Sequence, residues 1–195
     1  MPIILISLLL VLPLAGVATA GPLDMAGAPQ ALVCSACHGF AGQSQSNTMP
    51  ILAGMPTWYF KKAIQDYAAA KRLSPEMEPY AKQVVQSGLD DVAAYFAAQK
   101  RTATSVKVDS AAIERGRAAA VQCTVCHGAS GKGDQSKGVP DLTGQPPGYL
   151  RNQMLLFKAD RRSPGDAQLK ALKALMLTIP DDQLADLAAY WSSVR

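Results

Sequence analysis

The sequence predicts an all-α protein made of two similar domains in tandem. Apolar residues recur at helical spacing near the end of each half, whereas the alternating apolar and polar pattern of β-strands is absent. The same landmarks also return in the same order along the chain, which indicates an internal duplication. The matched segments are 33–39 with 122–128, 50–54 with 140–144, and 91–96 with 186–191; Tyr59, Tyr67 and Arg72 match Tyr149, Phe157 and Arg162.

Residues 1–20 have the pattern of an export signal. They contain no charged side chain, and Ile3–Val17 form an almost unbroken apolar run. The run is followed by Ala18-Thr19-Ala20, the small-x-small pattern that a signal peptidase accepts. We therefore predict a cleaved signal peptide over residues 1–20 and a periplasmic protein. An uncleaved membrane anchor is the alternative, since about 18 apolar residues can span a bilayer.

We expect the first domain to span residues 21–100 and the second to span residues 109–195, with a linker over 101–108. Polar and β-branched residues break the helical periodicity near the linker, and Asp109 or Ser110 is suited to cap the next helix. Apolar residues at i, i+3, i+4 and i+7 predict the last helix of each domain and read as core packing. They are Leu89, Val92, Ala93 and Phe96 in the first domain, and Leu184, Leu187, Ala188 and Trp191 in the second.

Each half carries a Cys-x-x-Cys-His motif. Cys34 and Cys37 precede His38 in the first, and Cys123 and Cys126 precede His127 in the second. This motif is the attachment signature of c-type haem: each cysteine forms a thioether with a haem vinyl group, and the histidine binds the iron. Two covalently bound haem c groups would also give each domain, of roughly 80 to 90 residues, the apolar body that so small a core needs.

Three other uses of the cysteines fit the sequence less well. A shared four-cysteine zinc site leaves both histidines unexplained and requires two repeated domains to hold one metal. Redox disulfides of the thioredoxin type need βαβ surroundings, which are missing. Structural disulfides are ordinary in exported proteins, but the chain has only 2 histidines and both follow a cysteine pair. The repeated histidine therefore favours haem.

At these motifs the sequence resembles the dihaem cytochrome c4 family and the related cytochrome subunits of flavocytochrome c sulfide dehydrogenases. The resemblance covers nearly the whole chain after residue 20 and includes the Pro-x-Leu-x-Gly segments and the Leu-Ala-Ala-Tyr-Trp ending. It implies two tandem cytochrome c-like domains, each of three to four short helices around a covalently bound haem. It also implies that the carbonyls of Pro50 and Pro140 accept hydrogen bonds from the two iron-binding histidines.

The resemblance further implies a methionine as the sixth ligand of each iron. Met77, 18 residues before Tyr95, stands in the family's register. The corresponding position before Tyr190 is Leu172, so Met176, one helical turn further, is the predicted ligand in the second domain. The alternative is a second haem that is five-coordinate or takes another ligand.

These features predict an electron carrier and not an enzyme. An iron bound by His and Met has no free position for substrate, and no acid–base pair or serine triad stands beside the motifs. We expect redox proteins as partners: a membrane oxidoreductase, a terminal oxidase or a dehydrogenase. The alternatives are a fixed electron-transfer subunit of a dehydrogenase complex, or a haem enzyme or gas sensor acting through an open second haem.

Charge points to no further partner. The net charge is +4 and the basic residues are scattered, so no basic stripe for nucleic acid is present. Lys61-Lys62 and Arg161-Arg162 are predicted to be solvated faces, with a haem propionate or a partner's acidic patch as the other possible neighbour. Peripheral association with the membrane is compatible with this composition.

Overall fold

The computed structural model describes residues 21–195, so the predicted signal peptide lies outside the described residues. Every regular element in this range is helical and none is a strand, which confirms the all-α prediction. The α-helices of the first half are α1 (Ala28–His38), α2 (Thr57–Ala68), α3 (Met77–Ser87) and α4 (Leu89–Ala98). Those of the second half are α5 (Ser110–Ala119), α6 (Thr124–His127), α7 (Pro147–Lys158), α8 (Lys170–Thr178) and α9 (Asp181–Ser193).

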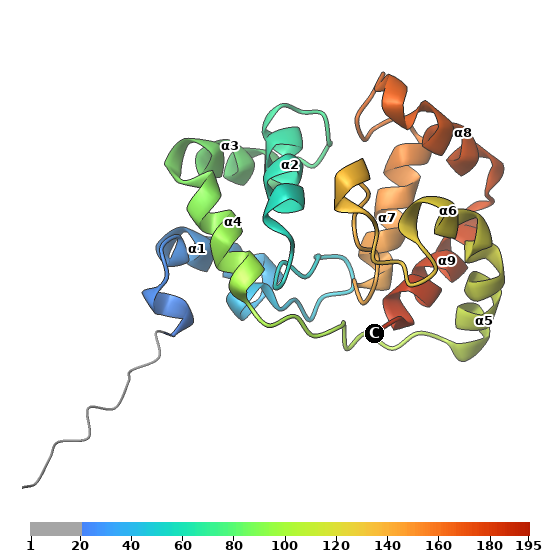
Figure 1. The fold of residues 1–195 in the computed structure, drawn as a ribbon, viewed down its shortest axis with the longest axis horizontal. Coiled ribbons are helices and arrows are strands. Elements are labelled where there is room, and N and C mark those ends of the chain that lie inside the picture. Colours follow the sequence, from blue (N-terminus) through green and yellow to red (C-terminus); the bar gives the residue numbers. More distant parts are fainter. Residues whose placement is uncertain (1–20) are drawn as a thin grey trace, which may run out of the picture.

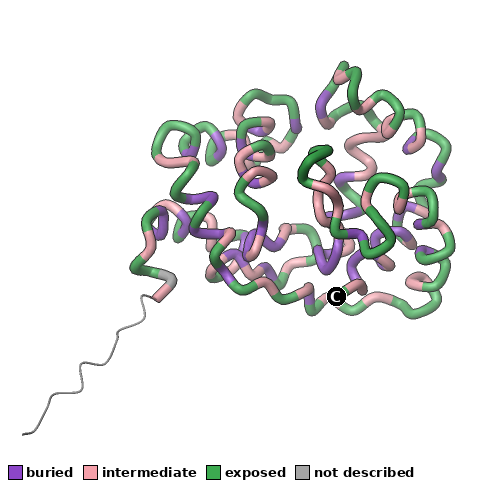
Figure 2. The backbone as a smooth tube through the Cα atoms, in the orientation of Figure 1, coloured by how far each residue is buried: buried purple, intermediate pink, exposed green. Residues whose placement is uncertain are grey.

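The two halves form separate helical units that lie side by side (Figure 1). Helices α1–α4 gather in one unit and α5–α9 in the other, and an extended segment joins α4 to α5 beside the C-terminus (Figure 1). Each unit contains its own cluster of buried apolar side chains, as the buried stretches inside both halves show (Figure 2). Because each half buries a core of its own, each qualifies as a domain.

The helical stripes predicted from the sequence face these cores. Val92, Ala93 and Phe96 on α4 are fully buried, and Leu89 is half-buried against them. The four matching residues on α9 are also buried: Leu184, Leu187, Ala188 and Trp191. The repeat therefore reflects two cores built on the same plan, and the stripes are packing surfaces as expected.

A close helix crossing explains a repeated glycine in each half. Gly27 and Gly116 both stand seven residues before the first cysteine of their motif. A Cβ on Gly27 would lie 2.5 Å from the carbonyl of Asp91, and one on Gly116 would lie 2.0 Å from the carbonyl of Asp186. Any side chain would force the crossing helices apart, because real Cβ contacts are never this short. The glycines thus fix how the first α-helix of each domain, α1 or α5, meets the last, α4 or α9.

The second domain starts at a capped helix. The Asp109 carboxylate accepts hydrogen bonds from the backbone N–H groups of Ala111 and Ala112, which confirms the predicted cap of α5. Within residues 21–195, none of the helices has the length and apolar character needed to cross a bilayer.

Candidate haem-binding sites and the domain interface

The first Cys-x-x-Cys-His motif forms the last turns of α1. Cys34 is half-buried against the core of the first domain, Cys37 is exposed, and both are free thiols. Burial raises the pKa of the Cys34 thiol. The helix ends at His38, where Gly39 adopts a φ of 76° and turns the chain away.

The second motif has the same order of residues on a less regular helix. After α5 the backbone tightens into a 3₁₀ turn over Ala120–Cys123, and α6 then carries Cys126 and His127. Cys123 is half-buried against the second core and Cys126 is exposed, so the pattern of burial repeats that of the first motif. Burial raises the pKa of the Cys123 thiol as well.

Both motif histidines are held by a backbone carbonyl. The distance from His38 Nδ1 to the Pro50 oxygen is 2.9 Å, and that from His127 Nδ1 to the Pro140 oxygen is also 2.9 Å. A carbonyl only accepts, so Nδ1 carries the proton in each ring and the lone pair of Nε2 is left for a metal. The contacts expected for Pro50 and Pro140 are confirmed.

Burial keeps both imidazoles neutral. It lowers the pKa of His38 and of His127, and the proline carbonyls only partly offset this. Two free thiols and one neutral, oriented imidazole in each domain are the donor set that a covalently attached haem requires. The residues present therefore fit the group that the motifs predicted.

The two predicted methionine ligands lie in different surroundings. Met77 is the first residue of α3 and is half-buried against the first core. Met176 lies near the end of α8 and is 4% exposed, within the second core. Met154 on α7 is half-buried against the same core, which agrees with a packing role.

The domains meet through a buried arginine of the first. Arg72 is 3% exposed, although a guanidinium is always charged. Its Nη2 donates to the Tyr149 hydroxyl at 2.8 Å, and its Nε and Nη2 donate to Gln153 Oε1 at 3.0 and 2.7 Å. Tyr149 and Gln153 belong to α7 of the second domain, so these hydrogen bonds cross the interface.

The repeat-equivalent residue makes the reciprocal contact. Arg162 Nη2 donates to the Tyr59 hydroxyl at 3.0 Å, and Arg162 Nη1 donates to Gln153 Oε1 at 3.0 Å. The prediction that Arg161-Arg162 forms a solvated face is therefore wrong for Arg162, because docking of the first domain covers it. Lys62 is exposed as predicted and Lys61 is half-exposed; they form ion pairs with Asp66 and Asp90, respectively.

This arginine–tyrosine cluster has an unbalanced charge. Among the residues that the structure describes, no carboxylate forms an ion pair with Arg72 or Arg162. Burial raises the pKa of Tyr149 to about 12. Burial opposes ionisation of Tyr59 too, but the charges of Arg162 and Arg72 outweigh it and hold the pKa of that phenol below its usual value. Buried cations normally pair with anions, so this interface is suited to receive carboxylates.

Sequence reasoning did not identify the cluster as an interface. The signal was present, because Tyr59 with Arg72 and Tyr149 with Arg162 recur at matched positions outside the apolar stripes. Gln145 makes a second interface contact, but no repeated residue in the sequence signals it. Its amide accepts from the N–H of Ile51 at 2.9 Å and donates to the Ile51 carbonyl at 2.9 Å.

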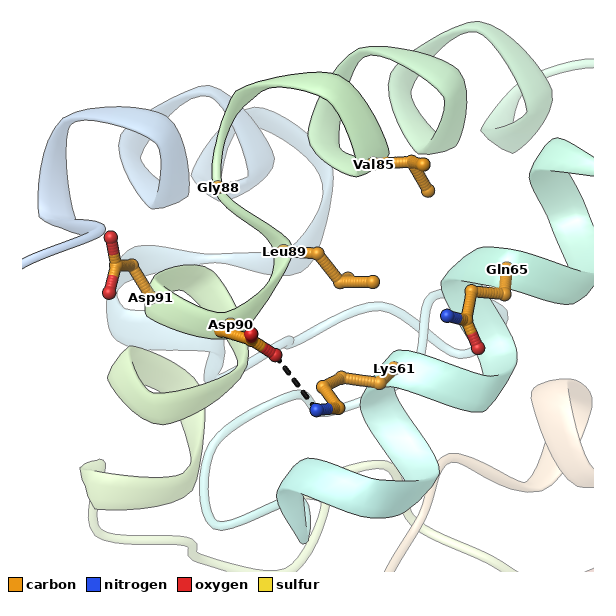
Figure 3. A pocket seen from close by; sticks show the side chains of 7 residues that line it. All are labelled: Lys61, Gln65, Val85, Gly88, Leu89, Asp90 and Asp91. Atoms are coloured by element: carbon orange, nitrogen blue, oxygen red, sulfur yellow. Dashed lines mark hydrogen bonds and ion pairs between the residues drawn. The ribbon is translucent and has the colours of Figure 1, made fainter.

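A surface depression in the first domain is separate from both motifs. It lies between α2 and the corner that joins α3 to α4, and the Lys61–Asp90 ion pair of 2.8 Å crosses it (Figure 3). Its walls carry no cysteine, histidine or methionine (Figure 3). It is therefore not a candidate for holding the haem.

Comparisons with known proteins agree with this geometry. The Cytochrome c family model matches residues 113–195. Cytochrome c4 of Pseudomonas aeruginosa is 34% identical over 96% of both chains. A thiosulfate dehydrogenase electron acceptor of Stutzerimonas stutzeri is 28% identical over 85% of this chain and 81% of its own. The crystal structure of reduced recombinant cytochrome c4 from Pseudomonas stutzeri has a TM-score of 0.75 at 28% identity, over 87% of this chain and 98% of its own.

The likeness to cytochrome c4 extends through both domains and includes both motifs. The tandem cytochrome c domains and the two covalently bound haem c groups expected from the sequence are thus confirmed. The chain belongs to the cytochrome c4 family of dihaem electron-transfer proteins.

Proposed function

We propose that this cytochrome is a periplasmic shuttle that passes single electrons between respiratory redox proteins. The observation that carries the proposal is the repeated donor set, in which each domain presents two free thiols and a histidine fixed by a proline carbonyl. A bound haem iron supplies one-electron chemistry, and the protein sets its potential and its access to partners.

Each residue of the motifs has a defined part. Cys34 and Cys37 anchor the first haem and His38 binds its iron, with Met77 as the sixth ligand. Cys123 and Cys126 anchor the second haem, and His127 binds that iron. The hydrogen bonds to Pro50 and Pro140 keep each imidazole in one tautomer and orientation, which limits reorganisation when the charge of the iron changes.

The interface cluster supports the binding of two haems close together. Haem propionates are carboxylates, and in the described part of the chain neither the buried Arg72 nor the half-buried Arg162 has an ion-pair partner. Propionate binding there would neutralise both guanidiniums and complete the domain contact. Because Arg72 belongs to the first domain and Arg162 to the second, the same cluster would hold a propionate from each haem.

The experiment is expression of the full chain in a strain that matures c-type cytochromes. The secreted product should begin at Gly21, carry two haems by intact mass, and titrate as two one-electron centres. The double variant Cys123→Ala with Cys126→Ala should retain one haem. A colourless product at the mass of the processed polypeptide would refute the proposal, and a product that retains residues 1–20 would support a membrane anchor instead.

A fixed or dedicated electron acceptor of a dehydrogenase is the second candidate. It is favoured by the similarity to the thiosulfate dehydrogenase electron acceptor, which extends over most of both chains. The two candidates differ in stable association, so the purified cytochrome should be mixed with a thiosulfate dehydrogenase, run on gel filtration, and tested for reduction by that enzyme. A complex that survives gel filtration favours the acceptor, and fast reduction without a complex favours the shuttle.

A further inference from the structure

We infer that the haem iron of the second domain has an open coordination position and binds a small neutral ligand such as carbon monoxide when reduced. The inference rests on the proposed function, since it assumes that the second motif holds a haem. It concerns which residue of the second domain stands where Met77, the predicted iron ligand, stands in the first. The sequence pointed to Met176, but the pattern of burial points to Leu172.

Helices α4 and α9, the last of each domain, show which residue numbers of the two domains correspond. Val92 and Phe96 on α4 are buried in the first core, and Leu187 and Trp191 on α9 are buried in the second. Both pairs differ by 95 in residue number (187 − 92 and 191 − 96). Because these helices carry the same core stripe, this difference relates equivalent positions in the C-terminal part of each domain.

Helices α3 and α8, which precede α4 and α9, correspond with the same difference in residue number. On α3, Met77 is half-buried, and Ala81 and Val84 are fully buried. On α8, Leu172 is half-buried, as are Lys173 and Leu175, and Met176 is buried; Ile179, just beyond the helix, is buried too. The spacing of four and then three residues is the same, and each pair again differs by 95. Leu172 therefore corresponds to Met77, and Met176 corresponds to Ala81.

Met176 occupies a core position in this arrangement. It is 4% exposed and belongs to the cluster that contains Leu184, Leu187 and Trp191. To reach the place of Met77, its sulfur would have to move by one helical turn, about 5.4 Å along the helix axis. Such a shift would also leave its present place in the core empty, which close-packed interiors resist.

Hydrogen bonds at both ends of α8 hold the helix in place and oppose such a shift. Lys158 donates to the Ile179 carbonyl at 2.7 Å, just beyond the C-terminal end of the helix. Lys173, in its first turns, donates to Asp160 at 2.5 Å and to the Ser163 carbonyl. These contacts tie α8 to the end of α7 and to the loop that follows α7, and so hold Leu172 in the position of Met77.

Leucine has no atom that can bind iron, and the chain has no histidine besides the two of the motifs. An iron with one imidazole and no second protein ligand is open to small molecules that bind ferrous haem, such as carbon monoxide or nitric oxide. The first domain has Met77 at the equivalent position. The chain would thus combine one closed haem for electron transfer with one open haem.

The test is carbon monoxide titration of the full, reduced protein carrying both haems, followed by visible difference spectra and the infrared stretch of bound carbon monoxide. We expect one carbon monoxide per chain at neutral pH. Leu172→Met should lose this uptake and, when oxidised, gain a second weak red band from iron–sulfur bonding. Met176→Leu should bind one carbon monoxide like the wild type, as should the packing control Met154→Leu, whereas Met77→Leu should bind two.

The outcomes separate this inference from the proposed function. A chain with fewer than two haems by mass would overturn both. A chain with two haems that takes up no carbon monoxide, or one in which Met176→Leu raises the uptake, would overturn the open site alone. In the second case Met176 is the ligand, as the sequence predicted.

Discussion

Arg72 donates a hydrogen bond of 2.8 Å to the hydroxyl of Tyr149 across the domain interface. Its repeat-equivalent, Arg162, makes the same contact with Tyr59, the repeat-equivalent of Tyr149, at 3.0 Å. In each domain the arginine thus donates a hydrogen bond to the tyrosine of the other domain, as in the self-complementary interface of a two-fold symmetric dimer. The duplication has preserved within one chain the geometry of two copies facing each other.

The first prediction concerns this reciprocal contact. Arg72→Met should weaken domain docking, because it leaves the buried Tyr149 hydroxyl without its arginine donor, at about 1–3 kcal/mol, and leaves Gln153 with the hydrogen bond from Arg162 alone. Lys100 in the connecting segment is exposed, so looser docking should speed tryptic cleavage there. Lys62→Met, at an exposed lysine of the same domain, is the control and should be cleaved at the wild-type rate. Equal cleavage of Arg72→Met and wild type would show that the contact does not hold the domains together.

The second prediction concerns Gln145, which is 5% exposed and pairs with both backbone groups of Ile51. Gln145→Ala should lower the free energy of unfolding by about 1–3 kcal/mol for each buried backbone group left unpaired. Gln145→Glu keeps an acceptor for the N–H of Ile51 but cannot donate to its carbonyl when ionised. Urea unfolding of the holoprotein measures both changes, and a Gln145→Ala variant as stable as wild type would contradict the role of this contact.

How much the sequence could predict depended on how local the contacts are. The histidine–proline hydrogen bonds were predicted correctly from the resemblance to the cytochrome c4 family, and the core stripes from the helical period; both lie within one domain. The environment of Arg162 was predicted wrongly, since its burial comes from docking of a domain far away in the sequence. A single charged residue carries no periodic signal of that docking. Met176 stays a prediction, because helical spacing identifies its face but not its distance from an iron.

The third prediction concerns the crossing of α5 and α9. Gly116→Ala should separate the two helices, because the new Cβ would lie 2.0 Å from the carbonyl oxygen of Asp186. Overpacking of this kind costs about 1–3 kcal/mol, against a small gain in helix propensity. Thermal unfolding of the holoprotein checks it, with Glu114→Ala on the exposed face of α5 as the control. A Gly116→Ala variant that melts at or above the wild-type temperature would disprove the close crossing.

The fourth prediction concerns the acid stability of the same crossing. Arg115 donates two hydrogen bonds to Asp186, at 2.7 and 2.8 Å, and this bonding lowers the pKa of the carboxyl below its ordinary value of 3.8. A carboxylate whose pKa is lowered by folding stabilises the protein fully above its unfolded pKa, and this contribution is lost as the pH falls through the folded pKa. Asp186→Asn should therefore melt below the wild type at pH 6, and the difference should shrink once the pH drops under 3.8. The control is Asp182→Asn, in the first turn of the same helix. A difference between Asp186→Asn and wild type that stays constant down to pH 2.5 would mean that the substitution acts through packing and not through the charge of Asp186.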